Sequence, residues 1–148
     1  MAHACASLGS VVGVTAERDL RVLLSDLSPE RHPGRYVYAT VPDGTLPGGV
    51  APVVTVRESE GLTLVLPEAE AAAAGLTYTY VAGWITLRAH SALEAVGLTA
   101  AVSLALTDAG ISCNVVAGFH HDHLFVPYER VGDAVTVLER LAAESRTG

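Results

Sequence analysis

Residues 84–127, WITLRAHSALEAVGLTAAVSLALTDAGISCNVVAGFHHDHLFVP, decide the fold of this chain. The stretch starts inside an apolar, β-branched and aromatic run that is typical of a strand. Leu98, Val102 and Leu106 then recur at helical spacing, and Gly110 is a natural helix stop. The pattern therefore predicts the order βαββα. Its elements are a strand over residues 77–89, a helix over 98–109, strands over 111–117 and 123–126, and a helix over 131–141.

The preceding half of the chain has a similar alternation of elements. Leucines at 20, 23, 24 and 27 recur at helical spacing with charged residues between them, and Thr15 is available as a cap. The turn formers over residues 28–34 indicate that this helix stops there. The elements predicted next are a strand over 36–41, a loop over 42–49, a hairpin of strands 53–57 and 62–66, and a short helix over 67–74 that Gly75 closes.

Together these elements predict an α+β fold. We expect two ferredoxin-like units side by side, with antiparallel sheets and helices on one face, because a split βαβ crossover places sheet and helices in two layers around a core. The predicted division is a loose leader over 1–16, a first unit over 17–76 and a second over 77–148. A single mixed sheet is the alternative.

Composition excludes several classes of protein. All 9 basic residues are arginine, so neither a lysine-dependent phosphate loop nor Schiff-base chemistry can be built. A net charge of −7 without clustered arginines argues against a nucleic-acid partner. Cys5 and Cys113 are far apart and form no CxxC pair, which fits a reducing compartment. No stretch suits a membrane span, so we expect a cytoplasmic protein.

The segments 84–99, 109–116 and 121–127 resemble an ACT domain, and 60–67 resembles the first unit of a tandem ACT arrangement. ACT domains are regulatory modules that bind amino acids or related small molecules, often between two domains or subunits. The resemblance therefore implies a ligand-binding regulatory or sensor module for an amino acid or similar metabolite, and not an enzyme. The family unit is usually βαββαβ, whereas residues 145–148 are too short and polar for a last strand. That strand must come from the other unit, from a partner chain, or not at all.

The predicted ligand site lies around the start of the helix over 98–109. Backbone amides at a helix N-terminus favour a carboxylate, and Gly97 lets one approach; alternatively, Ser91 and Glu94 form a capping box and Gly97 only allows tight packing. Asp122 is assigned to the ligand ammonium, unless it merely closes a tight turn. The complete set of predicted ligand-binding residues is Glu94, Ala95, Val96, Gly97, Leu98, Asn114, Val115, Asp122, Glu60 and Thr63. Asn114 could equally be a satisfied polar residue of an edge strand.

The run His120-His121-Asp122-His123 raises the alternative of a small metal-dependent enzyme. Alternate residues of a strand face opposite sides, so we expect His121 and His123 on one side and His120 and Asp122 on the other, and no single face gathers three ligands. We therefore predict no metal, no cofactor and no catalytic residue. A third hypothesis is a protein-interaction module without a ligand. Sheet-edge pairing makes a homodimer a further expectation, by analogy with the family.

Overall fold

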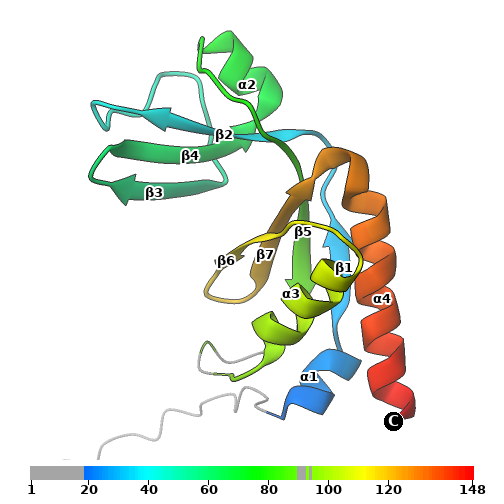
Figure 1. The fold of residues 1–148 in the computed structure, drawn as a ribbon. Coiled ribbons are helices and arrows are strands. Elements are labelled where there is room, and N and C mark those ends of the chain that lie inside the picture. The colour runs from blue at the N-terminus through cyan, green and yellow to red at the C-terminus, as the bar shows by residue number, and fades with distance from the viewer. Residues whose placement is uncertain (1–18, 90–92, 94) are drawn as a thin grey trace, which may run out of the picture.

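The computed structural model describes residues 19–89, 93 and 95–148. Its strands form one seven-stranded sheet in the order β3-β4-β2-β5-β7-β6, and β1 pairs with β5 off this path (Figure 1). Every pairing is antiparallel. The strands are β1 (Ser28–Arg31), β2 (Tyr36–Val41), β3 (Val54–Glu58), β4 (Gly61–Pro67), β5 (Val81–Arg88), β6 (Asn114–Ala117) and β7 (Asp122–Pro127).

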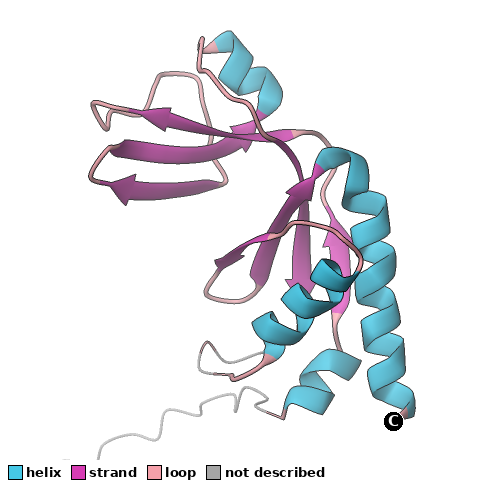
Figure 2. Cartoon of the chain, in the orientation of Figure 1, coloured by secondary structure: helices cyan, strands magenta, loops and turns pink. Residues whose placement is uncertain are grey.

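Four α-helices are described, and they cover separate parts of the sheet. Figure 2 shows α1, α3 and α4 together beside β1, β5 and β7, whereas α2 lies against β2 and β4. The helices are α1 (Leu20–Ser25), α2 (Glu68–Ala73), α3 (Leu98–Asp108) and α4 (Val131–Thr147), with a short 3-10 turn at Tyr128–Arg130. No helix among the described residues is long and apolar enough to cross a membrane.

Strand β5 joins the two halves of the molecule. Its first residues pair with β2, and the rest of the strand pairs with β7 on one side and β1 on the other. The α+β class, the antiparallel pairing and the ferredoxin-like arrangement are confirmed, and the two units share one continuous sheet. The division at residues 76 and 77 stays a prediction, and the segment 1–16 lies outside the described residues.

The strand that the second unit lacks is β1, which precedes the other strands of the first unit in the sequence. The turn formers over 28–34 predicted only a stop, and that prediction is wrong for β1, which pairs with β5 from Ser28↔Arg88 to Arg31↔Ile85. Pro29 is tolerated because β1 is an edge strand that needs hydrogen bonds on one side only. The preceding helix α1 buries Leu23 against the core of α3, α4 and β5, so burial of its leucines holds β1 in place.

Several element ends differ from the predicted ones. The strand over 77–89 is shorter, starting at Val81, and the strand over 111–117 starts only at Asn114. The last helix is longer, continuing to Thr147. The hairpin, the strand over 36–41 and the helix closed by Gly75, with its φ of 69°, are confirmed. Asp19 caps α1 by accepting from the Arg21 amide, whereas the predicted cap Thr15 is not described.

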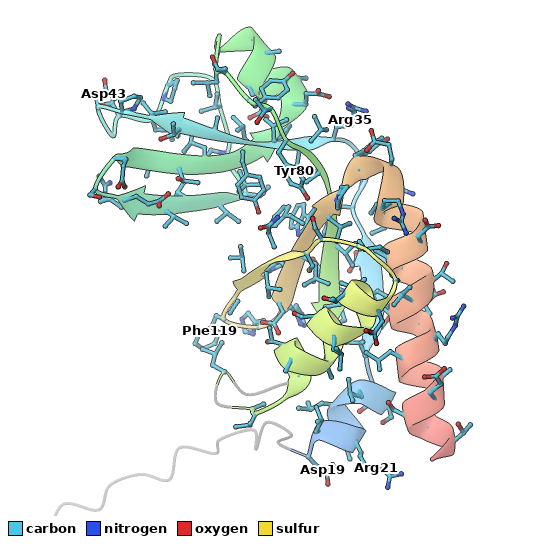
Figure 3. The ribbon with its side chains drawn as sticks, viewed as in Figure 1. Asp19, Arg21, Arg35, Asp43, Tyr80 and Phe119 are labelled. Carbon is cyan, nitrogen blue, oxygen red and sulfur yellow. The ribbon has the colours of Figure 1, made fainter. Side chains whose placement is uncertain are left out.

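The face of the sheet opposite the helices, called here the helix-free face, carries aromatic side chains. Phe125 is fully buried there, and Tyr38 and Trp84 pack around it. Val54 and Val65 of the first half join the same cluster, so the curl of the sheet brings both halves together on this side. Tyr80 lies where the halves meet (Figure 3).

Candidate functional site

A small cavity lies between the start of α3 and the turn that joins β6 to β7. Its volume is about 80 Å³. The α3 side contributes Leu98 and Thr99, and the start of β7 contributes Asp122. Figure 3 places Phe119 of the turn at the edge of this region. The complete lining is Leu93, Ala95, Leu98, Thr99, Ala117, Gly118, Phe119, His120, His121 and Asp122.

Helix α3 begins at the cavity, and no side chain in the described part of the chain caps it. Gly97 occupies the cap position with a φ of 100°, a backbone conformation that L side chains rarely adopt. The first helical hydrogen bond runs from the Ala101 amide to the Gly97 carbonyl, and the first turn of α3 contains no acidic residue. The amides before Ala101 therefore give this end of the cavity a positive electrostatic potential.

Asp122 supplies a carboxylate from the opposite side. Strand alternation puts it on the same face as Leu124, which is buried against the helices. Within the described part of the chain, its side chain makes no hydrogen bond or ion pair with another residue. Burial raises the pKa of Asp122, while the imidazoles of His123 and His121 oppose that shift. Asp122 is thus a half-buried acid with no hydrogen-bond or ion-pair partner among the described residues, although two imidazoles lie close enough to affect its pKa.

The structure brings together some of the predicted site residues. Ala95, Leu98 and Asp122 line the cavity, and Gly97 caps the helix beside it. Val96 is 85% exposed and points away from the core. Glu94, and with it the capping-box alternative, lies outside the described residues.

Asn114 and Val115 do not meet at this cavity. Val115 is half-buried against the helical core, and neighbouring residues of a strand face opposite sides. Asn114 therefore lies on the helix-free face, at the end of β6 far from Ala117, where its register partner is Phe125. It is exposed, and the Tyr80 hydroxyl lies near it.

Glu60 and Thr63 belong to the hairpin of β3 and β4, at the far side of the other half. Thr63 pairs with Thr40 of β2, whereas β2 reaches β5 only at Tyr36 and Val37. The Thr63 hydroxyl donates to Glu58 within the hairpin. The hydrogen bond from Ser59 lowers the pKa of Glu60, which is fully exposed. Within one chain this hairpin does not close the cavity (Figure 1).

The sequence analysis did not predict that the turn between β6 and β7 lines the cavity. The signal was present, because Gly118 in front of a polar run marks a tight turn. The Gly118 amide donates to the His121 carbonyl at 2.9 Å, and a Cβ at Gly118 would lie 2.7 Å from that carbonyl oxygen. Only glycine therefore lets the turn close in this form and place His120 and His121 beside the cavity.

The histidine run does not form a metal centre in the described residues. There, no group of three or more His, Cys, Asp or Glu side chains could hold a metal ion. His120 is exposed, and His123 lies on the helix-free face. The predicted grouping of His121 with His123 is wrong, because His120 and His121 lie in the turn before β7 and line the cavity with Asp122, whereas His123 faces the other side.

A second, more open hollow of about 340 Å³ lies between α3 and α4. Asp108, Arg140 and Glu144 line it together with apolar residues. It is larger than the cavity at the start of α3, but none of the predicted site residues reaches it. The smaller cavity combines a helix N-terminus with an unpaired carboxylate, which is the more specific arrangement for a ligand.

Comparisons with known proteins agree with this architecture. Two ACT-domain family models match in tandem, over residues 15–83 and 79–140. A Vibrio cholerae protein of unknown function, described as a possible transport protein, is 46% identical, with a TM-score of 0.76 over 84% of this chain and 97% of its own. Among curated proteins none matches.

Two more distant structures share the fold. A protein from Agrobacterium tumefaciens is 18% identical, with a TM-score of 0.62 over 78% of this chain and 89% of its own. The regulatory subunit of aspartate kinase from Thermus thermophilus is 8% identical, with a TM-score of 0.55 over 76% of this chain and 95% of its own. With two family models in tandem and a relative of 46% identity, this chain belongs to the ACT-domain family.

Proposed function

We propose that this chain is a regulatory module that binds an amino acid or a similar zwitterionic metabolite in the cavity between α3 and the β6–β7 turn. The amides at the start of α3 take the ligand carboxylate, and Asp122 takes its ammonium. The ACT-domain matches and the aspartate kinase neighbours support a ligand-binding regulatory role. The observation that supports a ligand with both a carboxylate and an ammonium is the start of helix α3 facing a half-buried acid.

Asp122 is the residue on which this proposal depends most. A half-buried carboxylate without an ion-pair partner costs the folded protein free energy, because burial disfavours its charged form, and the imidazoles of His123 and His121 offset only part of that effect. A ligand ammonium beside it removes that cost and adds a charge-assisted hydrogen bond. The same residue type at a purely structural position would be paired with an arginine or a backbone amide.

The size of the cavity limits what it holds. A volume of about 80 Å³ corresponds to roughly two or three water molecules, which suits the charged head of an amino acid and not a whole larger ligand. Leu93 and Phe119, at 67% and 82% exposure, leave an apolar rim around it. We propose that the ligand side chain lies on this rim and that a second copy of the chain covers it, in keeping with the expected homodimer.

The test is thermal unfolding of the purified protein with each of the twenty amino acids and, separately, with divalent metals. A ligand at a hundred times its dissociation constant stabilises the folded state by about 2.7 kcal/mol, which raises Tm by roughly 5–11 °C for a chain of this length. A shift with a few related amino acids supports the proposal. A response to a divalent metal alone would instead support the metal-dependent enzyme, and a silent panel with self-association would support the interaction module.

Asp122→Asn tests the assigned role. Losing a hydrogen bond between charged groups costs about 1.5–3 kcal/mol, which weakens binding roughly 10- to 150-fold. At the ligand concentration used above, a hundredfold loss leaves about 0.4 kcal/mol of stabilisation, or about 1 °C. Asp108→Asn, at the other end of α3, is the matched control and should keep the full shift. Unchanged affinity in Asp122→Asn would refute the assignment.

A further inference from the structure

A chain of polar groups crosses the helix-free face of the sheet from β1 to β7. The Trp84 indole N–H donates to His123 Nδ1 at 3.2 Å. The Thr86 hydroxyl oxygen lies 3.0 Å from the same Nδ1 and 2.7 Å from His32 Nε2. Thr86 is only 4% exposed, and it is the one buried polar residue in the described part of the chain.

The donors and acceptors of this chain have a single consistent direction. An indole N–H can only donate, so His123 Nδ1 carries no proton and its imidazole is neutral with the proton on Nε2. The Thr86 hydroxyl then points to Nδ1 and shares the single lone pair of that nitrogen with the indole, and the hydroxyl oxygen accepts the proton of His32 Nε2. Only the indole has a fixed role, so protonation of His123 Nδ1 deprives Trp84 of its acceptor.

Trp84 connects this chain to the attachment of β1. The His32 ring stacks on the Trp84 indole, with ring centroids 3.6 Å apart and planes 12° from parallel. The His32 backbone amide also donates to the Trp84 carbonyl at 2.9 Å. In addition to the backbone pairing of β1 with β5 and the Glu30–Arg88 ion pair, the chain just after β1 is held to β5 through the Trp84 side chain, whose own position depends on the acceptor at His123.

We propose that His123 is an acid-sensitive latch for the α1–β1 segment. When Nδ1 takes up a proton, two N–H groups face each other and Trp84 loses its acceptor. The Thr86 hydroxyl can reverse its role, but the indole cannot, so Trp84 moves and its stack with His32 opens. The hold of β1 on β5 then weakens. This device goes beyond the proposed ligand site, and it operates in the ligand-free protein.

The electrostatic surroundings keep the latch closed at neutral pH. Burial lowers the pKa of His123, and the neighbouring imidazoles of His32 and His121 lower it further, while Asp122 opposes them. Burial likewise lowers the pKa of His32, against the attraction of Glu30. The groups that face the cluster are Glu30 and His32 from β1, Arg88 from β5, His121 and Asp122 around the start of β7, and Tyr36 and Tyr38 from β2.

The sign of the pH effect follows from these shifts. The pKa of His123 is lower in the folded state than its ordinary value of 6.5, so the unfolded chain binds more protons as the pH falls. The stability that the neutral imidazole contributes is complete above pH 6.5 and is lost as the pH falls through the folded-state pKa.

The direct test uses the indole N–H signal in NMR, which is unambiguous because Trp84 is the only tryptophan. Between pH 8 and pH 5 this signal should move or broaden in one transition with a midpoint below 6.5. His123→Asn places an acceptor oxygen near the position of Nδ1 and cannot titrate, so its indole signal should stay unchanged. His120→Asn, in the exposed part of the same turn, is the control and should keep the transition.

Hydrogen exchange measures the second half of the proposal. At pH 5 the His32 amide should exchange several-fold faster in the wild-type protein than in His123→Asn, and at pH 8 equally fast in both. Comparing the two proteins at one pH removes the intrinsic effect of acidity on exchange. Equal protection at pH 5, or an indole signal that ignores the titration of His123, would overturn the latch.

The wild-type protein alone also decides the question if His123→Asn does not fold. The ¹⁵N shifts of the His123 ring should show Nδ1 without a proton at pH 8 and protonated below the transition. A ring that carries its proton on Nδ1 at pH 8, or that titrates at or above 6.5, contradicts the proposal.

Discussion

Replacing Leu23 by alanine tests whether the segment in front of the first unit belongs to the core of the second. Leu23 is 1% exposed and lies in the same buried cluster as Ile85 and Leu138, although it is far from both in sequence. Its neighbour Val22, on the same helix, is 40% exposed. The two positions form a matched pair that differs mainly in burial.

The expected loss follows from this burial. Truncating a buried leucine to alanine removes its transfer free energy and leaves a cavity, at a cost of about 2–5 kcal/mol. For a chain of this length that lowers Tm by roughly 4–20 °C. Val22→Ala should change stability by no more than about 0.5 kcal/mol, as surface substitutions usually do.

Urea unfolding followed by the fluorescence of Trp84 is the assay, because this reporter lies on β5 and not on α1. Far-UV circular dichroism in parallel shows whether the whole chain unfolds in one step. A loss below about 1 kcal/mol for Leu23→Ala, or a loss equal to that of Val22→Ala, would show that α1 is not part of the core.

Two further predictions concern a close contact and a buried thiol. Gly83→Ala should destabilise the protein by about 1–3 kcal/mol, because the added Cβ would lie 2.7 Å from two Val131 carbons. Gly132→Ala should stabilise the protein by about 0.4–1 kcal/mol, because a Cβ there meets no atom within 4 Å. Equal urea midpoints would contradict both. Burial raises the pKa of Cys113 to about 11, so in a Cys5→Ser chain iodoacetamide at pH 8 should react roughly 100-fold more slowly than after unfolding. Similar rates with and without urea would refute the burial of this thiol.

The local elements of the fold were predictable because their signals are short-range. Each of these signals depends on residues that are close together in the sequence. Examples are the leucine spacing of α1, the hairpin of β3 and β4, and the stop after α2. Strand alternation did not predict the arrangement of the histidine run, because His120 and His121 lie in a turn and only Asp122 and His123 belong to β7. At the candidate site, the start of α3 and Asp122 could be selected for the same reason, since a helix N-terminus and a turn acid are local features.

Tertiary structure alone decided where β1 lies and which residues share a face. Nothing in residues 28–31 indicates a strand, because Pro29 and the polar residues around it lack a strand pattern; the free edge of β5 and the burial of Leu23 create it. Asn114 and the hairpin residue Thr63 were grouped with Asp122, but sheet register separates them. Apart from β1, the sequence by itself determined the elements and their order, since propensity and periodicity act over a few residues. Pairing across the sheet depends on the free energy of burying distant apolar side chains together, which no single segment contains.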